Sequence, residues 1–163
     1  MLVVVMGPAG SGKSTVGPLL AAALGVPFAD GDDAHADAAR EQMALGIPLD
    51  DAARIPWLDR LHASLAAHVA TGLVLACSAL TPAYRARLRG DLFDVRFVAL
   101  EVPRAELEHR LATRAGHFVG PALVESQLAT LQLDDDTVVV DAHRPVADVV
   151  AAARSALRER HQT

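Results

Sequence analysis

The chain has 163 residues, 52% of them hydrophobic and 21% charged, with a formal net charge of −5 and one cysteine. These values predict a single globular domain, 1–163, with a sizeable core. They argue against nucleic acid as a partner, and one cysteine excludes an internal disulfide. No apolar run approaches the roughly 20 residues that span a membrane. The apolar start lacks a basic leader and a cleavage site, so we expect a cytoplasmic protein.

The first predicted element is a buried strand at residues 2–6, which leads directly into the phosphate-binding pattern G-x-x-x-x-G-K-S/T. Its glycines allow successive N–H groups to turn inward around phosphate oxygens. Lys13, the only lysine of the chain, is expected to contact the outer phosphates, and Ser14 to bind Mg²⁺. The alternative, a glycine-rich turn that binds nothing, is disfavoured by the preceding strand. The predicted nucleotide-binding residues of this loop are Gly7, Pro8, Ala9, Gly10, Ser11, Gly12, Lys13, Ser14 and Thr15.

A second chemical site is predicted where the next strand ends. After a helix at 15–24 and a short strand at 26–29 come Asp30-Gly31-Asp32-Asp33 and then His35. Carboxylates at the carboxyl edge of a parallel sheet lie beside a transferred phosphoryl group. Because side chains alternate on an extended backbone, Asp30 and Asp32 are expected on one side, one near magnesium and one accepting a hydroxyl proton. The alternative is a turn plus a helix N-cap.

The rest of the chain alternates helices and strands. Apolar spacing predicts strands at 72–77, 95–100 and 137–140, and helices at 33–45, 57–71, from 82 onward, 103–113, 121–131 and 145–158. This rhythm predicts an α/β fold with a five-stranded parallel sheet and helices on both faces. In the helix that Thr81 and Pro82 begin, Arg85 is nearest the strand end and is expected to face the site.

A mobile lid is predicted at about 110–120. Arg110 and Arg114 are spaced four apart, and Gly116 supplies a hinge, so this segment can close cationic groups over the nucleotide phosphates. The alternative is that Arg110 pairs with Glu106 at the same spacing and that Arg114 is solvated.

In order along the chain, these motifs resemble the gluconate kinase family. Besides the phosphate loop, the resemblance rests on four blocks: Asp30-Gly-Asp-Asp-Ala-His35, Gly46-Ile-Pro48-Leu with Arg54-Ile-Pro56-Trp57-Leu58, Cys77-Ser78-Ala79-Leu80, and Gly116-His117-Phe118 with Ser126-Gln127. The resemblance implies a three-layer P-loop NTPase sandwich, in a homodimeric cytoplasmic enzyme. It also implies Mg²⁺-dependent transfer of the ATP γ-phosphoryl group to the terminal hydroxyl of D-gluconate, giving 6-phosphogluconate.

The resemblance also implies residue roles. Lys13, Asp32 and Arg114 would be catalytic, Asp30 would join Ser14 near magnesium, and Arg110 would act with Arg114 in the lid. A guanidinium fork suits a carboxylate, so either Arg54 or Arg85 would hold that of gluconate. The implied acceptor-binding residues are Asp32, His35, Arg54, Ser78, Arg85 and His117.

The chain departs from the usual family pattern at three places, which bear on the acceptor rather than the phosphate chemistry. Alanines stand at 36 and 39 and again at 52 and 53, and Gln132-Leu133-Asp134 replaces an acid followed by proline. Two alternatives therefore stay open. One is a kinase of another small hydroxy acid, such as shikimate or another aldonate. The other is a non-catalytic nucleotide-binding module, which would leave Asp32, His35 and the two arginines without a role.

Overall fold

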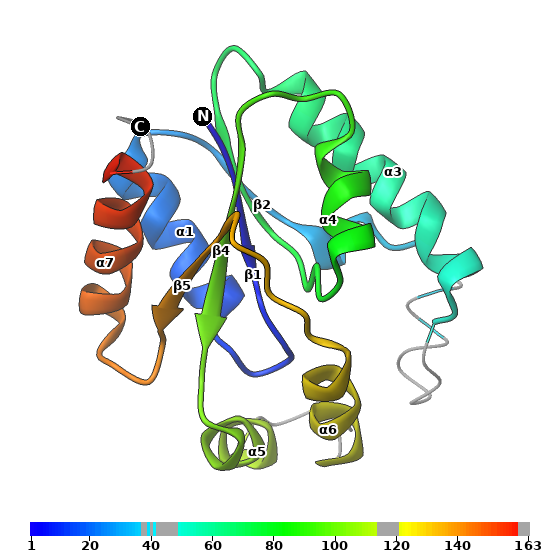
Figure 1. Cartoon of the computed structure of the whole chain (residues 1–163), viewed down its shortest axis with the longest axis vertical. Coiled ribbons are helices and arrows are strands. Elements are labelled where there is room, and N and C mark those ends of the chain that lie inside the picture. Colours follow the sequence, from blue (N-terminus) through cyan, green and yellow to red (C-terminus); the bar gives the residue numbers. More distant parts are fainter. Residues whose placement is uncertain (37–38, 40, 42–48, 114–120, 160–163) are drawn as a thin grey trace.

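The computed structural model describes residues 1–36, 39, 41, 49–113 and 121–159 (Figure 1). Five parallel strands form one sheet in the order β2-β3-β1-β4-β5, which confirms the predicted sheet. The strands are β1 (Leu2–Met6), β2 (Phe28–Asp30), β3 (Leu73–Ala76), β4 (Val95–Glu101) and β5 (Thr137–Asp141). Because β1 is central, the phosphate loop that follows it lies at the middle of the sheet's carboxyl edge.

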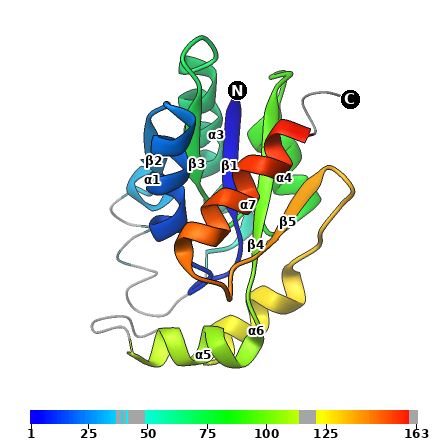
Figure 2. The ribbon, with the colours of Figure 1, turned by 90° about the vertical axis from the view of Figure 1, so that its left-hand side faces the viewer.

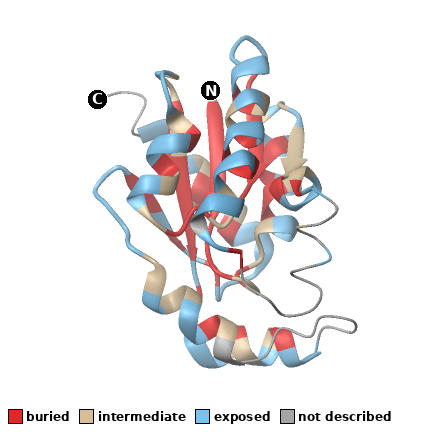
Figure 3. Cartoon of the chain, turned by 90° about the vertical axis from the view of Figure 1, so that its right-hand side faces the viewer, coloured by how far each residue is buried: buried red, intermediate tan, exposed pale blue. Residues whose placement is uncertain are grey.

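Helices cover both faces of the sheet, as predicted. The helices α1 (Lys13–Leu24) and α7 (Val146–Glu159) lie on one face, and α3 (Asp51–Ala67) and α4 (Pro82–Arg89) lie on the other (Figures 1 and 2). The alternating side chains of β1 divide between the two layers: Val3 and Val5 pack with α1 and α7, whereas Val4 and Met6 pack with α3. A strand buried on both faces reads as a continuous apolar run, and the buried strands stand out in Figure 3.

Two further helices lie beyond the carboxyl ends of the strands. They are α5 (Arg104–Thr113) and α6 (Pro121–Thr130), and both views show them past the end of the sheet (Figures 1 and 2). The predicted lid, at about 110–120, starts within the last turn of α5, and its residues Arg114 and His117 are outside the described residues. Among the helices that the structure describes, none is long and apolar enough to cross a membrane.

Two predictions around the second site were wrong. The strand ends at Asp30, and Gly31–Ala34 form a short 3-10 helix, η1, so Asp30 and Asp32 do not share an extended backbone. Helix α3 begins at Asp51 rather than at Trp57, because the Asp50 carboxylate caps it by accepting from the Ala53 N–H at 2.7 Å. The predicted helix at 33–45 falls largely outside the described residues.

Candidate active site

The phosphate loop has the backbone that its glycines predict. Gly7, Gly10 and Gly12 have φ values of 145°, 81° and 98°, a region that favours glycine. Lys13 Nζ donates to the carbonyl oxygens of Gly7 and Pro8, both at 2.9 Å, so its charge lies over the loop. Gly12 is the N-cap of α1 and makes no side-chain cap, so the positive end of the helix dipole lies at the phosphate loop, where it favours an anion.

Asp30 joins the phosphate loop to the second site. Its Oδ2 accepts from the Ser14 hydroxyl at 2.7 Å, and its Oδ1 accepts from the Asp32 backbone N–H at 3.1 Å. Asp30 therefore caps η1, which confirms the alternative of a turn with an N-cap, and it also contacts the phosphate loop. A hydroxyl and a carboxylate side by side are the hard oxygen ligands that Mg²⁺ prefers, so these residues fit that ion.

Two of the side chains expected at the acceptor, His35 and Arg54, lie at the end of η1 and on α3. The nearly buried His35, 9% exposed, follows η1 and stacks on the Trp57 ring with centroids 4.3 Å apart and an interplanar angle of 9°. Arg54, on α3, is partly exposed and donates from Nη1 to the Tyr84 hydroxyl at 2.7 Å and from Nη2 to the Leu49 carbonyl at 3.0 Å. Two helices, α3 and α4, thus meet at the Arg54–Tyr84 contact.

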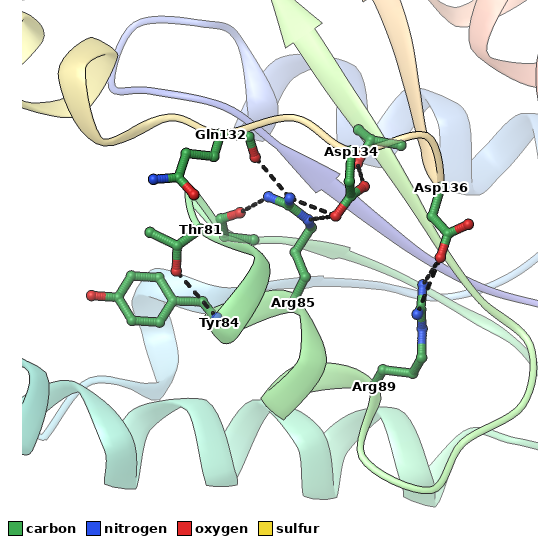
Figure 4. Close-up of polar contacts among 9 residues, drawn as sticks. Thr81, Tyr84, Arg85, Arg89, Gln132, Asp134 and Asp136 are labelled. Atoms are coloured by element: carbon green, nitrogen blue, oxygen red, sulfur yellow. Dashed lines mark hydrogen bonds and ion pairs between the residues drawn. The ribbon is translucent and has the colours of Figure 1, made fainter.

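Arg85 lies one residue after Tyr84 but points into the protein (Figure 4). Its side chain is 3% exposed and donates from Nη2 to Asp134 Oδ2 and to the Gln132 carbonyl, each at 2.7 Å. Nη1 donates to the Ala79 carbonyl at 3.0 Å. Arg85 therefore ties α4 to the segment between α6 and β5.

The Asp134 carboxyl is held ionised by this network. Burial opposes its charge, but the hydrogen bonds from Thr137 and Arg85 and the arginine charges outweigh that cost and keep its pKa below the usual 3.8. The Thr137 hydroxyl donates to Oδ1 at 2.6 Å, so both carboxylate oxygens are engaged.

The end of β3 borders the phosphate loop. The Ser78 carbonyl accepts from the Gly7 N–H at 3.3 Å, which brings this predicted acceptor residue to the loop. Burial raises the pKa of the neighbouring Cys77 thiol to about 12. The thiol therefore stays protonated at neutral pH and is not available as a nucleophile.

On the lid side, Arg110 makes the contact with Glu106 that was the alternative to a phosphate-binding role, and it also contacts the phosphate loop. Its Nε donates to Glu106 at 2.7 Å, the predicted alternative, and this hydrogen bond lowers the pKa of the Glu106 carboxyl. Its Nη1 also reaches the phosphate-loop carbonyl of Gly10 at 3.4 Å, and Nη2 that of Ala142 at 3.1 Å. Arg110 thus lies against the loop whose ligand it was expected to bind.

Comparison with known proteins identifies the family. A family model described as an AAA domain matches residues 2–134. A gluconokinase of Gluconobacter oxydans (strain 621H) is 45% identical over 151 residues, which are 90% of this chain and 85% of that relative. The chain belongs to the gluconokinase family.

Solved structures agree with the gluconokinase-family assignment and with the P-loop kinase fold. The crystal structure of a gluconokinase from Sinorhizobium meliloti 1021 matches with a TM-score of 0.89 at 39% identity, over 97% of this chain and 91% of that one. A shikimate kinase from Aquifex aeolicus vf5 matches with a TM-score of 0.62 at 19% identity over 99% of each chain, a likeness of fold alone. The resemblance found in the motifs is therefore confirmed.

Sequence reasoning on this gluconokinase-family chain missed two contacts at the site. Gln127 of α6 accepts from the Ala9 N–H of the phosphate loop at 2.6 Å, and Trp57 donates to the Gly31 carbonyl at 2.7 Å. Gln127 stood in a recognised motif block, and Trp57 was interpreted as a helix anchor. No local spacing connects either residue to its partner, because each partner lies in a distant part of the chain.

Proposed function

We propose that this chain is a gluconokinase that transfers the γ-phosphoryl group of ATP to the terminal hydroxyl of D-gluconate, giving 6-phosphogluconate. The observation that carries the proposal is the 2.7 Å contact between Ser14 and Asp30. It joins the phosphate loop to the turn that holds Asp32, so a nucleotide and an acceptor would meet at one edge of the sheet. The curated gluconokinase relative, 45% identical, supports the choice of acceptor.

The nucleotide half of the site uses the phosphate loop. Lys13 and the positive end of α1 would hold the phosphates, with Arg110 beside them and the lid residue Arg114 proposed to neutralise charge in transfer. Ser14 and Asp30 would hold Mg²⁺, which neutralises phosphate charge when it is bound.

The transfer itself needs one base and correct positioning. The acceptor hydroxyl oxygen forms a bond to the γ-phosphorus as the bond from that phosphorus to the bridging oxygen of ADP breaks. We assign the proton of the hydroxyl to the carboxylate of Asp32, which becomes a neutral acid and later releases it to water. Most of the acceleration comes from alignment of the reactants.

For the acceptor carboxylate, the contacts favour Arg54 over Arg85. Arg54 is partly exposed on α3, and its guanidinium fork suits a carboxylate. Arg85 is 3% exposed and is bonded to Asp134, so we give it a supporting role behind the pocket. His35, Ser78 and the lid residue His117 are proposed to contact the acceptor hydroxyls.

The test is release of ADP from Mg-ATP with a panel of acceptors, namely D-gluconate, shikimate, other aldonates and no acceptor. Turnover selective for D-gluconate is expected. Turnover with another acid and not with D-gluconate would support the kinase chemistry but show that the acceptor is a different acid. Slow hydrolysis that is equal with every acid would favour the nucleotide-binding module instead.

We further propose that the enzyme is a homodimer in the cytoplasm, as the family resemblance implies. Light scattering on the purified full chain measures the oligomeric state. We expect a mass near twice the 17.1 kDa of one chain. A mass of one chain at all concentrations would contradict it.

A further inference from the structure

Trp57 is a buried side chain with a polar N–H to which the mechanism above gives no role. It is the only tryptophan of the chain and is 4% exposed. Its indole Nε1–H donates to the Gly31 carbonyl at 2.7 Å through a buried hydrogen bond. A buried N–H donor is costly to leave without an acceptor, and a hydrogen bond has a preferred direction. This bond therefore fixes the position of the Gly31 carbonyl more closely than apolar packing would.

Gly31 is the backbone between the two acids, and it is held on its other side by the sheet. A Cβ added at Gly31 would lie 2.5 Å from the Ala76 carbonyl oxygen at the end of β3. The peptide that links Asp30 to Asp32 therefore fits between β3 and the indole ring. A displacement of Gly31 would move Asp32 away from the Ser14–Asp30 contact.

Helix α3 also holds the far end of η1. Arg60 Nε donates to the Ala34 carbonyl at 2.7 Å, and the Trp57 ring stacks on His35, the residue that follows η1. Arg54 precedes Trp57 by three residues, so the two lie on one side of the helix. One helix thus carries both the proposed ligand of the acceptor carboxylate and the contacts that fix the turn of Asp32.

We propose that Trp57 is a positioning residue whose indole N–H sets the place of Asp32 relative to an acceptor held by Arg54. This inference rests on the proposed function, because it assigns Asp32 and Arg54 their tasks. Misplacement of a catalytic group by about 1 Å can lower a rate by two orders of magnitude. An anchor that only packs α3 against the sheet needs the apolar ring and not the N–H, which separates the two roles experimentally.

The decisive variant is Trp57→Phe, which keeps an aromatic ring beside His35 and removes the N–H. We expect kcat with D-gluconate to fall roughly 10- to 100-fold while KM for ATP changes little. The matched control is Leu65→Val, which removes packing from the same core layer two helical turns further along α3. Leu65→Val should leave kcat near that of the wild type.

A second variant guards against loss of the fold in Trp57→Phe. Arg60→Met removes the exposed contact to Ala34 and leaves the core intact. A smaller fall in kcat, again without a change in KM for ATP, is expected.

A readout independent of activity separates this inference from the proposed function. Hydrogen exchange of a peptide covering residues 28–36 reports the Asp32 and His35 amides, which donate to Asp30 Oδ1 and the Asp32 carbonyl. Both Trp57→Phe and Arg60→Met should accelerate that exchange, and Leu65→Val should not.

Unchanged exchange in Trp57→Phe, or a kcat equal to that of the control, overturns the positioning role. A wild-type enzyme with no acceptor-dependent turnover overturns the proposed function instead, and the exchange result then still decides whether Trp57 fixes the turn.

Discussion

Replacement of Arg85 by methionine should lower the free energy of unfolding and have little effect on acceptor binding. The substitution leaves the Ala79 and Gln132 carbonyls without their donor and removes the cation beside Asp134. Each buried acceptor left unsatisfied costs about 1–3 kcal/mol, and breaking a buried ion pair costs about 3–5 kcal/mol. Because Asp134 is 39% exposed and can regain water, we expect a loss of about 3–5 kcal/mol in all rather than the sum.

The partner substitution gives an internal check of that magnitude. In Asp134→Asn the buried guanidinium of Arg85, 3% exposed, loses its carboxylate partner, but the new amide oxygen can still accept a hydrogen bond from it. We therefore expect a smaller loss of stability, about 1–3 kcal/mol. The double variant should lose less than the two single losses together, because both remove one interaction.

The pH dependence of this pair has a definite sign. Since the pKa of Asp134 is lowered in the folded protein, its stabilisation is complete above its usual value of 3.8. The stabilisation is lost as the pH falls through the lower folded-state value. The stability difference between the wild type and Asp134→Asn should therefore be constant near neutral pH and shrink only below about pH 4.

Urea unfolding followed by tryptophan fluorescence measures these differences, because Trp57 is the only tryptophan. The reasoning is refuted if Arg85→Met unfolds at the wild-type urea concentration while its KM for D-gluconate rises. That result would instead support the acceptor role for Arg85 that the motif resemblance implies.

Three further predictions concern the catalytic groups. Lys13→Ala should lower turnover by roughly 10²–10³ or more while thermal unfolding stays that of the wild type, and full turnover would remove the loop from the mechanism. Asp32→Asn should lower kcat by about 10²–10⁴ with little change in ATP affinity by calorimetry, and an unchanged rate would exclude it as the base. Gly31→Ala places a Cβ 2.5 Å from the Ala76 carbonyl, so a stability loss of about 1–3 kcal/mol with reduced kcat is expected, and wild-type behaviour would show that the turn can shift freely.

The sequence predicted the sheet and the phosphate loop well because both depend on local patterns. The apolar run of β1 and the glycines at 7, 10 and 12 carry their own geometric requirements, and both were found. The boundaries near the acceptor were predicted less well. Pro56 and Trp57 were interpreted as the start of a helix, whereas the cap at Asp50 sets the start earlier and Pro56 lies inside α3.

The contacts that fix the site were not predictable from local sequence. Arg85 was placed at the correct edge of the sheet, but its partner Asp134 lies 49 residues away, and only the fold brings the two together. The same holds for Trp57 and Gly31. A single sequence gives the type of residue at a strand end, whereas the direction of its side chain depends on tertiary packing.

The alanines at 52 and 53 provide a test of whether departures from the family pattern mark a changed acceptor. Both lie in the first turn of α3, and both are exposed. Arg54, the next residue, turns instead toward Tyr84. Acids at these positions should therefore act on the helix rather than on the pocket.

We expect Ala52→Glu to stabilise the N-terminus of α3 by about 0.3–1 kcal/mol through the helix dipole, and to leave the ratio of kcat/KM values across the acceptor panel unchanged. Ala66→Glu, an exposed change near the other end of α3, is the control that adds the same charge and should give no such gain. A shift in acceptor preference in Ala52→Glu alone would show that the first turn of α3 contributes to the acceptor pocket.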